Sequence, residues 1–161
     1  MKIFKAFYHL NALIKKVINK IVFGKKISFG KGTTFRMNFK IYLENTGKIS
    51  IGNNVFFNHN CSLNCLESIE IGDNCLFGEN VKIYDQNHKF KDRKEKISEQ
   101  GFTTAPVKIG ENCWICSNVI ILKGVSIGDN CVIGANSLVY KDIPSNSVVK
   151  NKSELLINEI H

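Results

Sequence analysis

The first part of the chain lacks acidic residues. None occurs before Glu44, although ten lysines and arginines do. The 161-residue chain carries a formal net charge of +8, and from Glu44 onward 12 basic and 14 acidic residues nearly cancel. The positive charge therefore lies in the first 43 residues, a segment suited to phosphates, anionic lipid or nucleic acid. Because no nucleic-acid-binding motif accompanies it, we do not expect a nucleic-acid partner.

The sequence also lacks an uninterrupted apolar run. Between Met1 and Phe23, apolar residues recur at three- and four-residue spacing and lysines fill the remainder, which predicts an amphipathic helix. The lysines interrupt it too often for it to span a bilayer. No apolar core precedes a small-residue cleavage site, so it does not fit a signal peptide. We therefore expect a cytoplasmic protein.

The strongest pattern is a repeat of six residues. From Ile109 to Pro144 the sequence reads IGENCW, ICSNVI, ILKGVS, IGDNCV, IGANSL, VYKDIP, with a branched aliphatic residue first and a small or aliphatic residue fifth. A helix would place apolar residues three and four apart, so this period does not fit one. It fits a three-sided solenoid of about eighteen residues per coil, in which positions one and five point inward.

Earlier hexads begin near Phe29, which gives about five coils in all. The register breaks strongly between Ile83 and Ile109, where the polar segment 89–106 fits no strand pattern and is expected to protrude as a loop. The repeat is expected to stop after Pro144. We divide the chain into a helical segment, a solenoid and a tail with a short helix at Ser153–Ile160: residues 1–26, 27–149 and 150–161.

Two roles fit the N-terminal helix. It covers the open end of the solenoid, because exposed solenoid ends need covers. Alternatively, it lies on the inner face of a membrane, where its lysines meet anionic lipid. The sequence leaves both open.

The cysteines favour packing over metal or disulfide chemistry. Four of the six fall at hexad position five, where they act as small buried hydrophobes: Cys61, Cys75, Cys113 and Cys131. Cys113 and Cys116 form a C-x-x-C, but no second pair follows, so a zinc site is not expected. The absence of a secretory signal agrees with reduced thiols.

Several motifs in the second half of the chain match one known family: Asn87-His88, Gln100-Gly101, Pro106-Val107, Ile109 to Ile115, Gly124-Val125, Ile133 to Ser137 and Lys141 to Pro144. They resemble the sugar O-acetyltransferase branch of the hexapeptide-repeat acyltransferases, which includes maltose, galactoside, xenobiotic, capsule and O-antigen enzymes. The resemblance implies an all-β fold, the left-handed parallel β-helix. Handedness comes from the resemblance alone, because parallel crossovers are generally right-handed.

The resemblance assigns catalysis to His88, through the run Asp85-Gln86-Asn87-His88. Acyl transfer from the thioester of acetyl-coenzyme A to a hydroxyl needs a base, and histidine titrates near neutrality. The alternative is a histidine on a surface loop. Asp85 either orients His88 or a sugar hydroxyl, or only satisfies a turn.

The resemblance also assigns donor and acceptor contacts. Trp114, the only tryptophan, should project outward, either into the coenzyme A groove or into a subunit interface. The remaining donor positions are Ser117, Ala135, Tyr140 and Lys141, of which Lys141 suits a phosphate. An asparagine contacts the acceptor in the family, and both Asn60 and Asn64 match it, with Asn60 preferred.

These assignments imply an acetyl-coenzyme A dependent O-acetyltransferase, without metal, that acts on a sugar or glycan precursor. The basic N-terminus favours surface-polysaccharide biosynthesis near the membrane. The family implies a homotrimer with active sites between subunits, and outward apolar residues agree with burial against a partner. Xenobiotic O-acetylation and a non-catalytic assembly module are the alternatives. A γ-class carbonic anhydrase would need three histidines, but the coils offer only His59 and His88.

Overall fold

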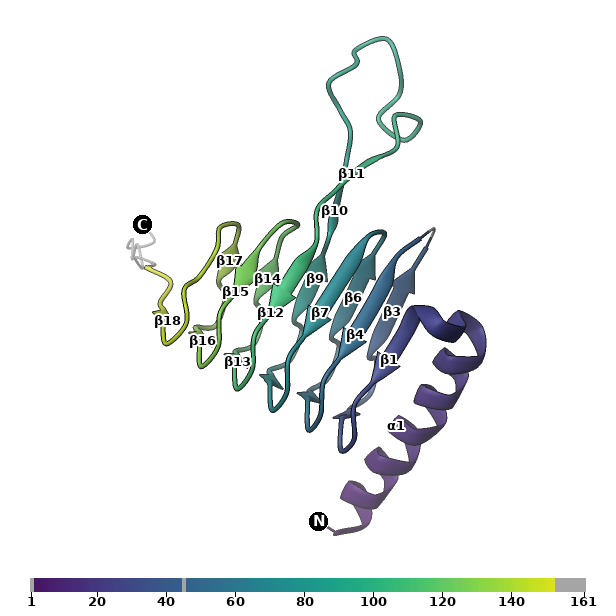
Figure 1. Cartoon of the computed structure of the whole chain (residues 1–161), viewed down its shortest axis with the longest axis vertical. Helices are drawn as coiled ribbons and strands as arrows, with labels where there is room; N and C mark the ends of the chain where they lie inside the picture. Colours follow the sequence, from purple (N-terminus) through teal and green to yellow (C-terminus); the bar gives the residue numbers. More distant parts are fainter. Residues whose placement is uncertain (1, 45, 153–161) are drawn as a thin grey trace, which may run out of the picture.

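The computed structural model describes residues 2–44 and 46–152. It begins with helix α1 (Lys2–Phe23) and a 3-10 turn, η1 (Gly24–Lys26), and continues as a parallel β-helix. The helix expected at Ser153–Ile160 lies outside the described residues. Figure 1 shows the coils stacked side by side, with α1 at the end where the first coil lies.

Three parallel sheets form the sides of the prism. Sheet A contains β1 (Ile27–Phe29), β4 (Lys48–Ile51), β7 (Ser68–Ile71), β12 (Val107–Ile109) and β15 (Ser126–Ile127). Sheet B contains β2 (Thr34–Phe35), β5 (Phe56–Phe57), β8 (Leu76–Phe77), β13 (Trp114–Ile115), β16 (Val132–Ile133) and β18 (Val148–Val149). Sheet C contains β3 (Lys40–Leu43), β6 (Ser62–Cys65), β9 (Lys82–Tyr84), β14 (Ile120–Ile121) and β17 (Leu138–Val139). The predicted left-handed β-helix is confirmed.

The core consists mainly of hexad positions one and five, as predicted, and Leu43 and Cys65 add to it from position three. Position-one residues pair with each other from coil to coil, as Ile71 does with Ile109, and both are buried. In the first coils the same positions hold stacked aromatic rings. The ring centroids of Phe35 and Phe39 lie 4.5 Å apart, and those of Phe57 and Phe77 lie 4.4 Å apart. Stacked rings add to the stabilisation from burial alone.

Two edges of the prism are regular. We call the turns from sheet A to sheet B edge AB, and those from sheet B to sheet C edge BC. Nearly every turn places an asparagine at hexad position four with positive φ, a conformation that asparagine tolerates better than most residues. The asparagines of edge AB are Asn54, Asn74, Asn112, Asn130 and Asn146, and those of edge BC are Asn38, Asn60, Asn80, Asn118 and Asn136.

Their side-chain amides form ladders along the prism. Asn80 Nδ2 donates to Asn118 Oδ1 at 2.9 Å, and Asn118 Nδ2 donates to Asn136 Oδ1 at 3.1 Å. Each rung joins one coil to the next, so the ladders stabilise the stacking of the coils. The ladders were not predicted from the sequence, although the position of these asparagines within the hexad was visible.

The third edge, from sheet C to sheet A, is irregular, and we call it edge CA. It carries an antiparallel hairpin of β10 (Gln86–His88) and β11 (Phe102–Thr104), which stands out from the prism (Figure 1). The segment 89–106 leaves the solenoid as expected, but the expectation of no strand in it was wrong. Phe102, Thr103 and Thr104 have high strand propensity, and Phe102 lies opposite His88 in the ladder.

The repeat extends beyond Pro144, contrary to expectation. Ile143 forms a bridge with Ile127, and Val148 pairs with Val132 in β18, so a sixth coil begins. The turn from Val139 to Ile143 is two residues shorter than a full hexad. This deletion at edge CA shifted the register, and a count in strict sixes from Val139 therefore missed the last coil.

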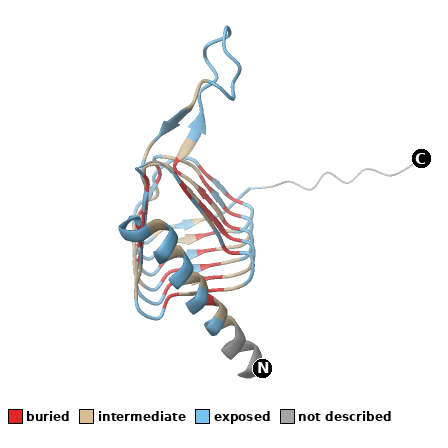
Figure 2. Cartoon of the chain, turned by 90° about the vertical axis from the view of Figure 1, so that its right-hand side faces the viewer, coloured by how far each residue is buried: buried red, intermediate tan, exposed pale blue. Residues whose placement is uncertain are grey.

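Helix α1 covers the open end of the first coil, which is one of the two roles predicted for it. It contacts β1 and β2, and Figure 2 shows it lying across that end of the prism. Ala12 is buried in the contact. The Arg36 guanidinium carbon lies 5.5 Å from the centroid of the Tyr8 ring. The centroids of the Tyr8 and His59 rings lie 5.8 Å apart, in an edge-on arrangement. Among the described residues, no helix is long and apolar enough to cross a membrane.

Candidate functional site

His88 lies at the foot of the hairpin on edge CA, as the last residue of β10. Its exposed imidazole packs against the Phe102 ring, with centroids 4.3 Å apart. Backbone pairing continues beyond it, because Lys89 N donates to Gly101 O at 2.9 Å. The ring is therefore held on a paired strand and remains exposed to solvent. Such a group can take up and return a proton.

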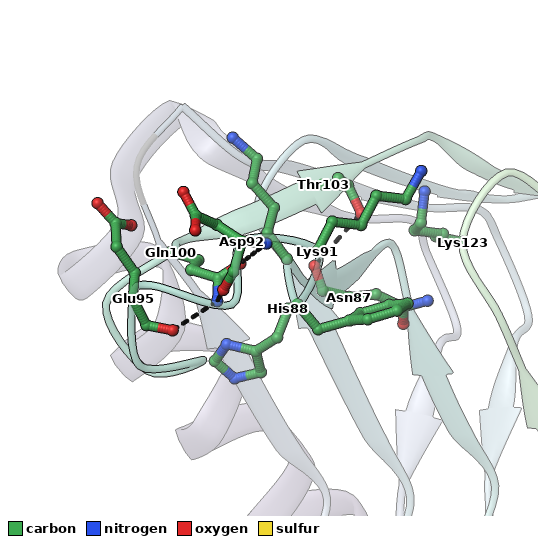
Figure 3. Close-up of a pocket in the computed structure, with 10 residues that line it drawn as sticks. Asn87, His88, Lys91, Asp92, Glu95, Gln100, Thr103 and Lys123 are labelled. Carbon is green, nitrogen blue, oxygen red and sulfur yellow. Dashed lines mark hydrogen bonds between the residues drawn. The ribbon is translucent and has the colours of Figure 1, made fainter.

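A hollow of about 590 Å3 opens beside His88. Its lining includes Asn87, Phe90, Thr103 and Lys123, and Figure 3 shows His88 and Lys123 on opposite sides of the hairpin base. The hollow combines an aromatic wall with a basic group from the neighbouring coil. A site of this size and mixed lining fits a small organic ligand.

Gln100 organises the loop that forms one wall of the hollow. Its Nε2 donates to Asp92 O at 2.7 Å and to Glu95 O at 2.9 Å, while its Oε1 accepts from Asp92 N at 3.2 Å. Gly101 follows with φ of +74°, a conformation that side chains rarely adopt. Gln100-Gly101, one of the motifs behind the family resemblance, thus shapes the loop, as Figure 3 shows for the glutamine.

Asp85 is completely buried and serves a turn. Its carboxylate accepts hydrogen bonds from Leu66 N at 2.8 Å, Glu67 N at 2.7 Å and Ser68 N at 2.9 Å. Its backbone oxygen accepts from Ala105 N at 2.9 Å, where the hairpin returns to the solenoid. Of the two roles predicted for Asp85, the structure favours the turn over a contact with His88 or with a sugar hydroxyl.

The candidate donor residues do not share one surface of the chain. Trp114 points outward from sheet B and is 52% exposed. Ser117 and Ala135 lie in successive coils on edge BC, where Ser117 Oγ accepts from Glu79 N at 3.1 Å. Tyr140 and Lys141 follow β17 on edge CA. Coils four and five do carry all five residues, but one chain does not bring them together in one groove.

The candidate acceptor residues are divided in the same way. Asn60 belongs to the ladder of edge BC, where its Oδ1 accepts from Asn38 Nδ2 at 3.0 Å. Asn64 lies in β6 on sheet C, paired with Tyr84 of β9, and its Nδ2 donates to Ile83 O at 3.2 Å. Asn64 is therefore on the His88 side of the prism, and Asn60 is on the far side of sheet C.

Lys123 was not predicted from the sequence. It occupies the third position of the hexad that begins at Ile121, and Lys141 occupies the same position in the hexad that begins at Val139. Because Ile121 pairs with Val139, the two lysines recur at equivalent places on edge CA. The eighteen-residue spacing between them was the signal that could have found Lys123.

All six cysteines are free thiols. Burial raises the pKa of Cys61 to about 11 and that of Cys65 to about 12, and it also raises the pKa of Cys116. The Cys75 side chain lowers the pKa of Cys113 to about 7 through a hydrogen bond, but Cys113 is only 1% exposed. A substrate cannot reach that sulfur, so the five buried thiols are not placed as nucleophiles, whereas Cys116 is partly exposed.

The chain is similar to known hexapeptide-repeat proteins. A family model described as "Bacterial transferase hexapeptide (six repeats)" matches residues 106–141, and one described as "Hexapeptide repeat of succinyl-transferase" matches residues 48–84. Galactoside O-acetyltransferase of Escherichia coli (strain K12) is 39% identical over 121 residues, which cover 75% of this chain and 59% of the relative. The chain thus spans about three fifths of that relative.

Two further relatives match more of the chain. A Dictyostelium discoideum protein named "Putative acetyltransferase" is 38% identical over 157 residues, which cover 94% of this chain and 76% of the relative. A solved structure of galactoside acetyltransferase in complex with coenzyme A has a TM-score of 0.64 at 32% identity, covering 83% of this chain and 63% of that one. The repeat, the three-sheet prism and these similarities agree, and the chain belongs to the hexapeptide-repeat acyltransferase family.

Proposed function

We propose that the protein is an acetyl-coenzyme A dependent O-acetyltransferase whose acceptor is a hydroxyl of a sugar or glycan precursor. The observation that carries this proposal is His88, exposed at the foot of the hairpin beside a hollow of about 590 Å3. The similarity to galactoside acetyltransferase, whose structure was solved with coenzyme A, supports the donor and the sugar acceptor.

The proposed reaction is a direct transfer. His88 accepts the proton of the acceptor hydroxyl as its oxygen attacks the thioester carbonyl, and a tetrahedral intermediate forms. A backbone amide near Ser117 or in the neighbouring chain stabilises the oxyanion. The C–S bond then breaks, and His88 returns the proton to the thiolate of coenzyme A. The raised pKa of Cys116 supports a direct route without an acyl-enzyme.

A homotrimer with shared active sites explains how the candidate residues are distributed. His88, Tyr140 and Lys141 lie on edge CA, whereas Ser117 and Ala135 lie on edge BC. Neighbouring chains in a cyclic assembly can bring edge CA of one copy against edge BC of the next, and a closed ring avoids open growth. Coenzyme A would then bind between subunits, with Lys141 and Lys123 available to its phosphates.

The outward side of sheet B supplies an apolar surface for this assembly. Its outward residues form a continuous column in register, with Leu76 50%, Trp114 52% and Val148 62% exposed: Thr34, Phe56, Leu76, Trp114, Val132 and Val148. The outward residues of sheet A are polar, as Ser50, Glu70 and Lys108 illustrate. A column of this kind is costly in water and is suited to burial against a partner.

We further propose surface-polysaccharide biosynthesis in the cytoplasm as the setting, where acetyl-coenzyme A and reduced thiols occur together. The catalytic unit is residues 27–149, preceded by the helical segment 1–26. One asparagine would face the acceptor, with Asn60 preferred over Asn64.

The test is a coenzyme A release assay with acetyl-coenzyme A and a panel of acceptors. The panel contains free sugars, nucleotide sugars, lipid-linked glycans and a hydroxyl-bearing antibiotic. The proposal expects release with at least one carbohydrate class and roughly 10²–10⁴-fold slower release by the His88→Ala variant. Release only with the antibiotic would contradict the sugar acceptor, and equal release by His88→Ala would contradict the site.

A further inference from the structure

The apolar side of helix α1 faces away from the solenoid. Its large aliphatic residues recur at three- and four-residue spacing and are between 51% and 78% exposed: Leu10, Leu13, Ile14, Val17, Ile18, Ile21 and Val22. We call these seven residues the outer stripe. The opposite side of the helix packs on the first coil through the buried Ala12 and the half-buried Tyr8, Asn19 and Phe23. The helix therefore covers the solenoid while its hydrophobic face stays in water.

The outer stripe forms one end of the whole molecule. Figure 1 shows α1 beyond β1 at the end of the stack of coils, and Figure 2 looks onto that end and shows the exposed side of the helix. The hairpin projects sideways from the prism rather than towards this end (Figure 1). A flat surface could therefore reach the outer stripe without meeting the hairpin.

The same end of the molecule is basic. Lys20 is exposed on α1, and the exposed Lys25 and Lys31 belong to the turn after the helix and to the first coil. No acidic residue precedes Glu44. An apolar stripe bordered by lysines, without acidic residues, has the character of helices that lie in the headgroup region of anionic membranes.

We propose that the outer stripe docks the protein on an anionic lipid surface. The aliphatic side chains enter the boundary between headgroups and acyl chains, and the lysines pair with lipid phosphates. A second copy of this chain fits less well, because it would bring two basic ends together, and neither has an acidic residue before Glu44. Like charges at short range oppose such a contact, whereas anionic lipid complements them.

Docking in this orientation would stand the prism upright on the membrane. Coils stack about 4.8 Å apart, and His88 follows the third coil, so it would lie on the order of 10–15 Å above the helix. That height suits an acceptor sugar carried on a lipid phosphate. If the proposed trimer forms with parallel prisms, three helices would share one face, and their binding would reinforce one another.

The experiment is flotation of the full-length protein with vesicles. One set is phosphatidylcholine alone, and the other contains about one part in four of phosphatidylglycerol. The test variant is Val17→Gln/Ile21→Gln. Ile97→Gln is the matched control for the single variant Ile21→Gln. Ile97 is 56% exposed and lies in the loop between β10 and β11, which Figure 1 shows away from α1. Circular dichroism establishes that each variant is folded.

We expect flotation with the anionic vesicles and little with the neutral ones. The double variant should bind on the order of tenfold or more weakly. Ile21→Gln should bind more weakly than the parent, and Ile97→Gln should bind as the parent does. Unchanged binding by the double variant, equal binding to neutral vesicles, or no binding by the parent would overturn the proposal.

Two further measurements separate the alternatives. If the double variant reduces the mass of the assembly in sedimentation without lipid, the outer stripe joins copies of the chain and the proposal is wrong. Coenzyme A release with a water-soluble acceptor is measured on the same preparations and should be equal for the parent and the double variant. If no preparation is active but vesicle binding follows the stripe, the proposed enzyme activity fails and the docking surface stands.

Discussion

Edges BC and CA are built from the same hexad repeat, yet they differ in almost every respect. Edge BC places an asparagine with positive φ in every full coil, and side-chain hydrogen bonds join Asn38 to Asn60 and connect Asn80, Asn118 and Asn136. Edge CA varies in length from coil to coil and carries the hairpin with His88. The regular edge joins the coils, and the irregular edge is free to carry chemistry. Substitutions on edge CA should mainly change activity, and those on edge BC should mainly change stability.

Asp85 is the instructive exception on edge CA. Among its described residues, that edge shows no asparagine ladder, and the buried Asp85 carboxylate instead accepts the backbone hydrogen bonds of the turn between β6 and β7. A turn that lacks the repeated asparagine is thus held by hydrogen bonds to a side chain that occurs only there. Asp85 lies three residues before His88, so it also fixes the point at which the hairpin leaves the prism.

The largest effect is expected for His88→Ala. Loss of a general base should lower turnover by roughly 10²–10⁴-fold, with little change in the affinity for acetyl-coenzyme A or in the melting temperature, because the imidazole is exposed. Steady-state kinetics measures the turnover and the dependence on acetyl-coenzyme A, and thermal unfolding measures the melting temperature. His9→Ala, at an exposed histidine of α1, is the matched control. A variant that keeps its turnover would remove His88 from the mechanism.

Asp85→Ala should instead unfold more easily. It leaves the backbone amides of Leu66, Glu67 and Ser68 without their acceptor, and unsatisfied buried donors cost about 1–3 kcal/mol each before water or relaxation compensates. We expect a loss of roughly 2–4 kcal/mol in the free energy of unfolding. Urea titration measures this loss. Asp85→Asn should recover part of the lost stability, because its carbonyl oxygen can still accept a hydrogen bond. Normal stability with lost activity would instead favour an acceptor contact.

Asn80→Ala tests the regular edge. Asn80 has φ of +59° and donates to Asn118. Forcing alanine into this conformation costs about 1–2 kcal/mol, to which the lost hydrogen bond adds. Asn80→Gly keeps the backbone conformation and loses only the side-chain contact, so it should fall between the parent and Asn80→Ala in urea titration. If Asn80→Ala and Asn80→Gly are equally stable, tolerance of positive φ is not the way in which Asn80 stabilises the turn.

A smaller effect is expected for Lys141→Ala. A phosphate contact binds ground state and transition state alike, so its loss should raise KM for acetyl-coenzyme A by about tenfold and leave kcat nearly unchanged. Lys31→Ala, at an exposed lysine on the first coil, is the control. A fall in kcat with unchanged KM would place Lys141 elsewhere in the reaction.

The sequence predicted the solenoid well because most inward residues within a coil recur with a period of six. Ile71, Ile109 and Cys113 were assigned to the core from their hexad positions alone, and all three are buried. The short turn before Ile143 could not be counted, because a deletion at an edge changes the register without changing composition. Strand β11 was missed because its three residues stand alone in a polar segment.

The site was predicted less completely than the fold. Periodicity gives the edge on which a residue lies, which is how Lys123 could have been found beside Lys141. It does not show that the apolar side of α1 turns outward, because the helix lies outside the hexad repeat and its packing on the first coil is not set by that period.

The central claim is that the active site is shared between chains, and mixing two impaired variants tests it most directly. His88→Ala chains and Trp114→Ala chains are unfolded together, refolded and assayed for coenzyme A release at limiting acetyl-coenzyme A. A shared site predicts recovered activity, because some sites then combine His88 of one chain with Trp114 of its neighbour. A double variant refolded alone should stay inactive. If the mixture assembles normally but shows no more activity than its components, the site lies within one chain and the claim is wrong.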